Sequence, residues 1–175
     1  RDTTAAPAVL EVRGLSRRGE YQDISLTLRA GEVLGLTGLI GAGRTELCHT
    51  LFGMTRADAG EIRLNGTPLH LRSNRDAVAR GIAYVSEDRK GDGLILSQDV
   101  KQNISIANLR ELASRGVVNA NAEIKIANQY KGSLNIKTPS VEQKVVNLSG
   151  GNQQKVSLAK WLFVKPNLLI LDEPT

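Results

Sequence analysis

The chain has 175 residues, 41% of them apolar, which is enough for one sizeable core and too little for two ordinary domains. Its net charge of +5 comes from 23 basic and 18 acidic residues spread along the chain, and only 3% of the residues are aromatic, so we expect no nucleic-acid groove. A single cysteine excludes an internal disulfide, two isolated histidines argue against a metal site there, and a reducing intracellular compartment fits. No apolar stretch approaches the roughly 20 residues that cross a bilayer, so any membrane must be reached through a partner.

The front of the chain predicts a linker followed by short strands. Residues 1–8 have neither the apolar core of a signal peptide nor a helical period, and we interpret them as a linker before a domain over residues 9–175. Two β-prone runs separated by a polar turn predict an antiparallel layer, and a later strand is expected to lead into a glycine-rich loop. In this part we expect strands at 9–12, 24–28, 32–37, 60–64 and 82–86, and helices at 45–52 and 73–81.

The periodicity of the sequence changes after residue 99. Apolar residues recur at helical spacing in two runs, 100–112 and 122–130, and they predict an inserted helical subdomain over about residues 97–165. A helix is expected at 152–163 and a buried strand at 168–171. Because strands alternate with helices, we expect an α/β fold with a mostly parallel sheet and helices on both faces.

A glycine-rich loop stands between the expected strand 32–37 and the helix after it. Such a loop points backbone N–H groups at one spot, where the helix dipole also favours negative charge, so we expect phosphate to bind there. The spacing matches G-x4-G-[KR]-T and places the Thr45 hydroxyl to ligate Mg²⁺. The alternative is a tight turn without a ligand. The candidate nucleotide-binding residues are Gly38, Leu39, Ile40, Gly41, Ala42, Gly43, Arg44, Thr45 and Glu46.

Arginine stands at position 44, where this motif has lysine. Its charge keeps the long-range attraction for phosphate, but its planar fork is larger than an ammonium group and cannot sit compactly between the β- and γ-phosphates. We therefore predict that the loop binds nucleotide and supports the charge of the transition state poorly.

Two carboxylates, Asp172 and Glu173, follow the expected strand 168–171. Ligands of parallel sheets gather outside the carboxyl ends of the strands, so both side chains are candidates for the site. We expect Asp172 to hold Mg²⁺ together with Thr45, and Glu173 to orient or deprotonate the attacking water as the catalytic residue. The alternative is that two acids merely solvate the end of a strand.

A second anion pocket is predicted at Ser149, Gly150 and Gly151, which precede a helix and carry no lysine. One chain cannot easily place both pockets on the same phosphate. Taken alone, a Ser-Gly-Gly turn could also be an ordinary helix cap.

The three segments occur in the order found in the nucleotide-binding domain of an ATP-binding cassette (ABC) transporter, and the chain resembles that family over residues 38–175. The signature segment, residues 148–154, has Asn152 in place of the usual glutamine. Its Asn-Gln-Gln-Lys-Val run resembles the second ATP-binding domain of bacterial monosaccharide importers of the ribose, galactose or xylose type, as does Ser-Glu-Asp-Arg-Lys at 86–90.

This resemblance implies a P-loop NTPase that binds ATP and Mg²⁺ and works as a transport-coupled ATPase, paired head to tail with a second nucleotide-binding domain. Residues 149–152 would contact the phosphates held by that second domain, and Glu87 would replace a glutamine that relays nucleotide state to the membrane partner. The implied partners are membrane permease subunits and, indirectly, a periplasmic or extracellular sugar-binding protein, at the cytoplasmic face of the cell membrane. For the adenine ring, Tyr21 and Arg18 are both candidates.

The resemblance also implies that the domain is incomplete at its C-terminus, because the family continues beyond Asp-Glu-Pro-Thr with a strand that inserts between the phosphate-loop strand and the acidic strand. We predict that the isolated chain is inactive, and either incompletely packed or completed by exchange with another copy.

The expected function is the ATP-binding domain of a monosaccharide importer, whose own loop is the weaker site and whose signature completes the stronger one. Two alternatives stay open. A nucleotide-binding regulatory half that does not hydrolyse is favoured by Arg44 and Glu87. A soluble ABC ATPase acting on DNA or ribosomes is disfavoured by the sparse aromatic residues, and a phosphate-loop kinase would not need the signature segment.

Overall fold

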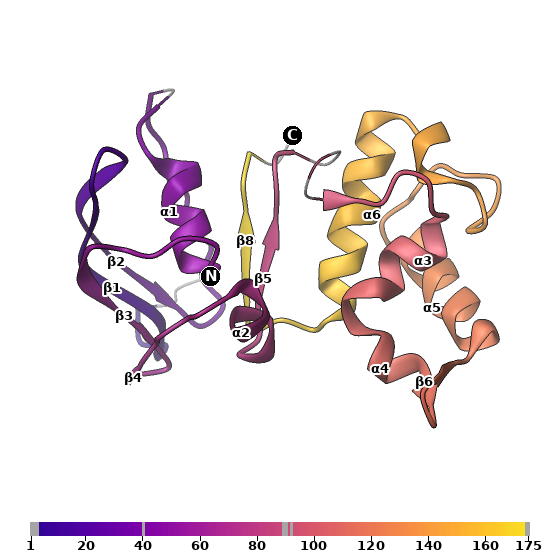
Figure 1. Cartoon of the computed structure of the whole chain (residues 1–175), viewed down its shortest axis with the longest axis horizontal. Helices are drawn as coiled ribbons and strands as arrows, with labels where there is room; N and C mark the ends of the chain where they lie inside the picture. The colour runs from indigo at the N-terminus through magenta and orange to yellow at the C-terminus, as the bar shows by residue number, and fades with distance from the viewer. Residues whose placement is uncertain (1–3, 40, 89–90, 92, 174–175) are drawn as a thin grey trace. The chain divides into compact units, whose positions relative to one another are not determined.

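The computed structural model describes residues 4–39, 41–88, 91 and 93–173, and the chain divides into two compact units, residues 1–82 and 83–175. The first unit contains β1 (Ala8–Arg17), β2 (Tyr21–Arg29), α1 (Arg44–Leu51), β3 (Ala59–Leu64), β4 (Thr67–Pro68) and α2 (Asn74–Ala79) (Figure 1). β5 (Ile82–Val85) crosses the boundary. The second unit continues with α3 (Val100–Ser105), the 3₁₀ helix η2 (Ile106–Asn108), α4 (Leu109–Leu112), β6 (Ala113–Ser114), β7 (Val117–Val118), α5 (Ala120–Ser133), η3 (Val145–Asn147), α6 (Gly150–Phe163) and β8 (Leu168–Leu171).

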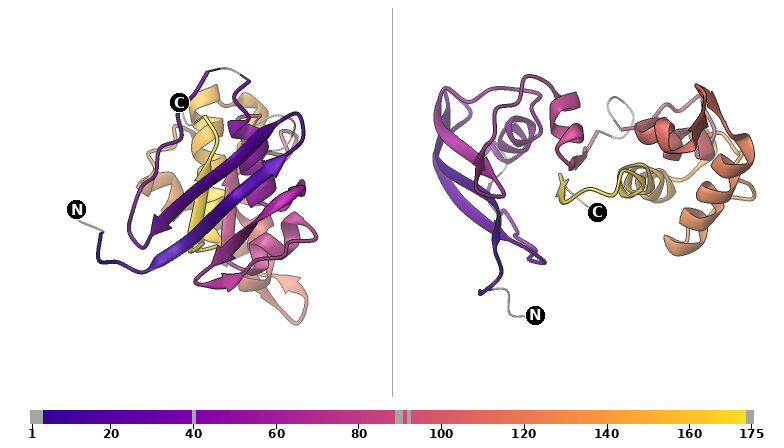
Figure 2. Two further views of the ribbon diagram at one scale, coloured as in Figure 1. Left: turned by 90° about the vertical axis from the view of Figure 1, so that its left-hand side faces the viewer. Right: turned by 90° about the horizontal axis from the view of Figure 1, so that it is seen from below.

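Four strands of the first unit form a sheet in the order β2-β1-β3-β4, with antiparallel neighbours throughout. This confirms the antiparallel layer predicted for the front, although β1 and β2 are longer than predicted and run side by side as a long curved ribbon (Figure 2). The register of β1 against β3 shifts between Arg13 and Ser16. A Cβ on Gly60 would lie 2.5 Å from the Gly14 carbonyl oxygen, and the φ of Gly60 is 92°, so this close approach requires glycine.

Helix α1 closes over this sheet with Leu47 and Leu51 buried. The Tyr21 hydroxyl, at the start of β2, donates a 2.7 Å hydrogen bond to Oγ1 of Thr50. Burial raises the pKa of the Tyr21 phenol, so the group stays protonated and keeps its donor. The helix ends at Gly53, whose φ is 76°, as the sequence predicts.

The strand predicted at 32–37 is wrong: residues 32–39 adopt no regular structure. A strand is stabilised by hydrogen bonds to a neighbour, and the described residues place no strand beside this segment. Its apolar side chains stay exposed as a result: Val33 is 97% exposed, and Leu34 and Leu36 are about two-fifths exposed, at 42% and 41%.

The two local signals that follow are confirmed. Asn65 and Gly66 have φ values of 50° and 76° and form the predicted turn behind β3. Ser73 caps α2, accepting a hydrogen bond from the backbone N–H of Asp76.

The core of the second unit lies between α3, α5 and α6 and the segments that join them. α3 begins with a capping box in which the side chains of Asp99 and Gln102 each accept from the other residue's backbone N–H. The helices predicted after residue 99 are present, while the limits of the subdomain, 97–165, and of the linker, 1–8, stay predictions. No helix of the described residues is long and apolar enough to cross a membrane. The buried apolar residues are Leu94, Val100, Ile104, Leu112, Ala127, Ile136, Val141, Val145, Leu148, Val156, Ala159 and Phe163.

A small antiparallel hairpin, β6–β7, separates α4 from α5 and was not predicted. Its turn residues, Arg115 and Gly116, have φ values of 51° and 83°. Two-residue hairpin turns with both φ values positive favour Asn-Gly or Asp-Gly, and Arg-Gly lacks that signal.

Strands β5 and β8 confirm the strands predicted at 82–86 and 168–171, and they pair with each other. β5 is buried along its whole length. β8 is buried less than predicted, since only Leu168 is fully buried and Leu171 is 44% exposed. Four successive aliphatic residues predict burial on both faces, but that burial needs covering elements that the described residues do not supply here.

Candidate functional site

The glycine loop leads directly into α1, with Gly43 as the residue before the first turn. Gly41 and Gly43 have φ values of 81° and 78°, in the left-handed region that favours glycine. No side chain forms a capping hydrogen bond at the start of the helix. Gly38, Leu39, Gly41 and Ala42 are exposed, and Ile40 lies outside the described residues.

The loop packs against the turn between β1 and β2. A Cβ on Gly43 would lie 2.2 Å from the carbonyl oxygen of Glu20 and 3.1 Å from Cβ of Tyr21, so only glycine allows this contact. The same turn holds an ion pair between Arg17 and Glu20. An occupant of the glycine loop would therefore have this turn as a neighbour within the first unit.

The Arg44 side chain folds back over the start of the loop. A Cβ on Gly38 would lie 3.8 Å from Cδ and 3.9 Å from Nε of Arg44. Arg44, Thr45 and Glu46 are all half-buried in the first turn of α1. The positive charge thus lies at the loop where phosphate is predicted to bind.

Asp172 is the buried member of the acidic pair, at 6% exposed. Its backbone N–H donates to the Val85 carbonyl at 3.0 Å, and the Tyr84 hydroxyl donates to its Oδ2 at 2.8 Å. Tyr84 is itself buried, at 4% exposed. These contacts hold the carboxylate in one orientation at the end of β8.

The donor chemistry of Asp172 and Thr45 fits Mg²⁺. A carboxylate and a hydroxyl are hard oxygen ligands, and Mg²⁺ commonly takes one or two protein ligands with the remaining positions filled by phosphate and water. Within the described ranges, no group of three or more His, Cys, Asp and Glu side chains could hold an ion by itself. Each of the two residues thus has the donor type that Mg²⁺ takes, and their joint role stays a prediction.

Glu173 and Glu87 are both exposed. Glu173 has a φ of 45°, a left-handed backbone that costs free energy outside glycine and is concentrated at functional sites. Glu87 follows β5 by two residues and starts the loop that leads to α3. Each predicted role stays a prediction, and solvent can reach both carboxylates.

The signature residues form the start of α6, two residues earlier than predicted. Ser149 is the N-cap by position, yet its side chain makes no capping hydrogen bond, and Gly150 and Gly151 are exposed. A Cβ on Gly151 would meet no atom within 4 Å, so the space before it is open. The ordinary capping role weighed above is therefore not how this serine is used.

Asn152 holds the serine from within the helix. Its Nδ2 donates to Oγ of Ser149 at 2.8 Å, and its Oδ1 accepts from the backbone N–H of Lys137 at 2.7 Å. The side chain thus links the signature to the segment before it, and we interpret it as orienting the Ser149 hydroxyl.

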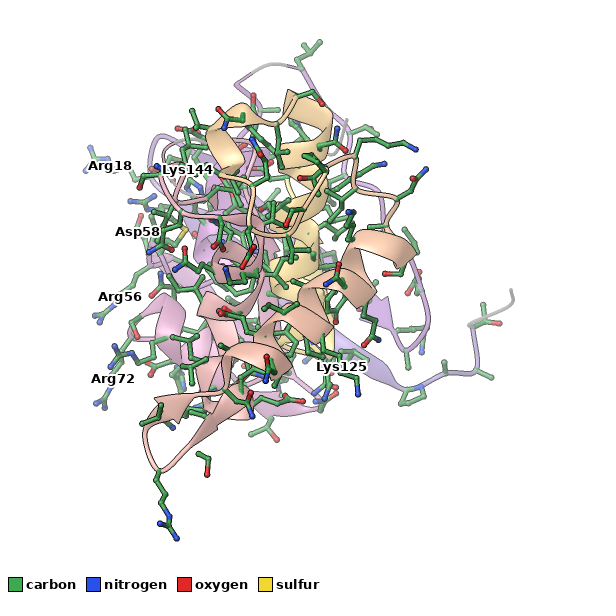
Figure 3. All side chains as sticks on the ribbon, turned by 90° about the vertical axis from the view of Figure 1, so that its right-hand side faces the viewer. Arg18, Arg56, Asp58, Arg72, Lys125 and Lys144 are labelled. Atoms are coloured by element: carbon green, nitrogen blue, oxygen red, sulfur yellow. The ribbon has the colours of Figure 1, made fainter. Side chains whose placement is uncertain are left out.

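Of the two adenine candidates, the structure favours Arg18. The Tyr21 ring is 8% exposed and its hydroxyl is engaged with Thr50, so it offers no open face. Arg18 is exposed, and its side chain points outward in Figure 3, with its backbone N–H held by the Asp58 carboxylate at 2.7 Å.

Three positions with polar buried groups were missed from the sequence: Tyr84, Asn103 and Lys160. Tyr84 interrupts an apolar strand with a hydroxyl that needs a partner, which is a usable signal. Lys160 lies beside Val156, Ala159 and Phe163 on the buried side of α6, where a charge is unexpected.

A family model described as "ABC transporter" matches residues 21–175. The chain belongs to the ABC transporter family. The match includes the ABC glycine loop, signature and acidic strand whose geometry is described above.

Curated ABC relatives are closely similar. A "Putative ribose/galactose/methyl galactoside import ATP-binding protein 1" from Rhizobium etli is 53% identical over 95% of this chain and 32% of its own length. A "Ribose import ATP-binding protein RbsA 1" from Agrobacterium fabrum is 49% identical over 98% of this chain and 34% of its own length. The chain thus spans about a third of the length of the curated relatives it matches.

Solved structures confirm the predicted fold class. A nucleotide-free ATP-binding cassette from an ABC transporter matches with a TM-score of 0.75 at 17% identity, covering 96% of this chain and 70% of that one. The ATP-binding cassette MJ0796, a dimer bound to ADP and Pi in a post-hydrolysis state, matches with a TM-score of 0.79 at 19% identity, covering 95% of this chain and 74% of that one. The chain therefore has the α/β P-loop fold of ABC cassettes.

Proposed function

We propose that this chain is an ATP-binding domain of an ABC importer, corresponding to the second such domain of monosaccharide importers, and that the intact protein couples ATP binding and hydrolysis to sugar uptake. The curated relatives named above support this, since ribose and galactose import stand in their names. ATP with Mg²⁺ is the expected nucleotide.

The observation that carries the proposal is how the helices start. In the described part of the chain, the helices longer than one turn fall into two groups: α2, α3 and α5 are capped by Ser73, Asp99 and Asn119, whereas α1 and α6 begin with glycines and have no side-chain cap. The two uncapped starts are the glycine loop and the signature. Gly41, Gly150 and Gly151 are exposed at these starts, while Gly43 is buried against the β1–β2 turn. An uncapped N-terminus preceded by glycines is suited to receive the charged oxygens of a phosphate.

Each residue of the glycine loop and of the signature segment then has a proposed role. The loop 38–46 holds the phosphates of one nucleotide, and Ser149 with Gly150 and Gly151 contacts the γ-phosphate of the nucleotide held by the second domain. Asp172 and Thr45 would hold Mg²⁺, which supplies charge neutralisation on the phosphates when bound. Glu173 orients the attacking water and accepts its proton.

The proposed partners follow from this arrangement. A second nucleotide-binding domain, in the same polypeptide or as a dimer mate, provides the opposite half of each site. Permease subunits in the membrane receive the motion, a sugar-binding protein delivers the substrate to them, and the ATP-binding protein works from the cytoplasmic face. We propose no nucleic-acid partner.

Uptake by the intact importer tests the proposal. Purified with its permease subunits in liposomes, it should import a labelled monosaccharide only when ATP is present on the side of this domain. Ser149→Ala, in the segment that completes the stronger site, should reduce uptake by at least tenfold. Glu173→Gln, at the weaker site, should reduce uptake by a smaller factor, and Ser114→Ala, on the β6–β7 hairpin, should leave it unchanged. An uptake rate that is unchanged in both Glu173→Gln and Ser149→Ala would contradict the proposal.

A non-hydrolysing regulatory half is the second candidate, because of Arg44. The guanidinium at the loop attracts phosphate but is too large for the compact place of a lysine ammonium. Arg44→Lys should then raise the turnover of this domain's own loop without tightening nucleotide binding. Equal turnover in both forms would show that the arginine does not weaken the site, and no turnover in either would favour the regulatory role.

A further inference from the structure

We propose that Lys160 is a positioning residue that joins the loop after β5, which contains Glu87, to the signature helix α6. The loop and the signature residues Ser149, Gly150 and Gly151 then move together. All the residues of this linkage belong to the second unit. Its use in the nucleotide cycle rests on the proposed function.

Lys160 contacts the loop directly. Nζ of Lys160, at the C-terminal part of α6, donates to the Gly93 carbonyl oxygen at 2.6 Å, and the lysine is only 8% exposed. The contact joins positions 67 apart in the sequence. It fastens the loop after β5 to α6, the helix that begins with the signature residue Gly150.

Gly93 is connected to the residues beside Glu87 by a continuous set of hydrogen bonds. The Asp88 backbone N–H donates to Oγ of Ser86 at 3.1 Å. The carboxylate of Asp88 accepts from the Gly91 N–H at 2.9 Å, and its carbonyl accepts from the Gly93 N–H at 3.1 Å. A displacement of the residues beside Glu87 is therefore passed to Gly93 and from there to Lys160.

The loop is fixed a second time just beyond Gly93. Asn103, which is 1% exposed on α3, accepts from the Ile95 N–H at 2.8 Å and donates to the Ile95 carbonyl at 3.0 Å. α3 packs on α6 through the core of the second unit. This end of the loop thus belongs mechanically to the helices.

At its N-terminal end, α6 carries the signature residues Ser149, Gly150 and Gly151. The helix runs without a break from Gly150 to Phe163, and an α-helix of this length behaves as a rigid rod. Asn152 fastens the Ser149 hydroxyl to its first turn. A displacement of Lys160 therefore changes the orientation of the signature residues 149–151.

The choice of lysine supports a positioning role over a purely stabilising one. Burial lowers the pKa of Lys160 to about 8, which means that the ammonium is held at a cost in free energy. An apolar side chain of similar length would fill the space without that cost. Keeping the ammonium makes sense where the bond to Gly93 is needed.

Hydrogen exchange with the 175-residue chain tests the linkage without any nucleotide. Lys160→Met keeps the length of the side chain and removes the donor. We expect amide exchange to become at least tenfold faster both in residues 86–96 and in the first turn of α6, 149–153, with no fall in the melting temperature. Lys160→Arg keeps a charged donor, so its amide exchange rates should lie between those of the wild type and those of Lys160→Met.

Lys155→Met is the matched control. Lys155 lies on the same helix and donates to the Asn135 carbonyl at 2.9 Å, so its loss should loosen the residues near 135 and leave 86–96 unchanged. Wild-type exchange rates in the Lys160→Met chain, or faster exchange in 86–96 alone, would overturn the linkage. So would a Lys160→Met chain that fails to fold, because the bond would then be structural. ATP binding by the wild type is a separate readout, so a failure there bears on the proposed function only.

Discussion

The Tyr84 hydroxyl donates a 2.8 Å hydrogen bond to Oδ2 of Asp172, and both side chains are buried. The two residues stand at the ends of the paired strands β5 and β8, 88 positions apart in the chain. The bond orients the carboxylate proposed to hold Mg²⁺. It also ties that carboxylate to the strand that leads into the Glu87 loop.

Tyr84→Phe removes this hydroxyl and keeps the ring. Because a buried carboxylate loses a donor, we expect the free energy of unfolding to fall by about 2 kcal/mol, measured by urea denaturation. Tyr130→Phe is the control, since Tyr130 meets Phe163 edge-on through its ring and should cost less. Equal losses in the two variants would show that the bond to Asp172 contributes nothing special.

Lys160 should give the chain a stability that rises with pH. Its pKa is about 8 when folded and near 10.5 when unfolded, so between these values the unfolded chain binds more protons and stability increases with pH. The full gain would be on the order of 3 kcal/mol, reached above pH 10. Urea unfolding at pH 7.5 and pH 9.5 checks this.

Lys160→Met should lose this part of the pH dependence, while Lys155→Met, on the same helix, should keep it. The side chains that are not substituted are the same in all three chains, so their contributions cancel in the comparison. A slope that survives in Lys160→Met would assign it to other groups.

The uncovered segment 32–39 should make the chain associate. Its backbone has no strand neighbour among the described residues, and Val33 and Leu39 are 97% and 85% exposed. Such segments pair readily with another chain. We expect light scattering to show a mass that rises with concentration, and Val33→Lys to reduce the rise. Val117→Lys removes a side chain that is 73% exposed on the β6–β7 hairpin, and it should have no effect.

Arg18 should discriminate ATP from a bare triphosphate. A guanidinium stacked on adenine contributes about 1–2 kcal/mol, so Arg18→Ala should weaken ATP binding roughly 5- to 30-fold and leave inorganic triphosphate unchanged. Arg56→Ala is the control, another exposed arginine of the first unit whose side chain is seen in Figure 3. Equal effects on both ligands would mean that Arg18 acts through its charge alone.

Local signals in the sequence predicted the elements that depend on local chemistry. Gly53 ends α1, Ser73 caps α2, and the glycine spacing of the loop matches backbone angles that glycine favours. These features need no distant partner, because each is a property of a few successive residues.

What could not be predicted depends on neighbours. The strand expected at 32–37 has the right composition, but a strand forms only beside another, and the sequence does not show where that partner lies. The bond from Tyr84 to Asp172 and the bond from Lys160 to Gly93 join residues far apart, so no local pattern contains them. Only the presence of a polar group in an apolar run hints at such bonds.

Residue-resolved NMR of backbone amides during a titration with Mg·ATP tests the central claim most directly. The account predicts saturable shifts at residues 41–46, where α1 begins, and shifts at 149–153 that appear only when a second nucleotide-binding domain is added. Amides of 41–46 that stay unmoved at millimolar ATP would contradict the account.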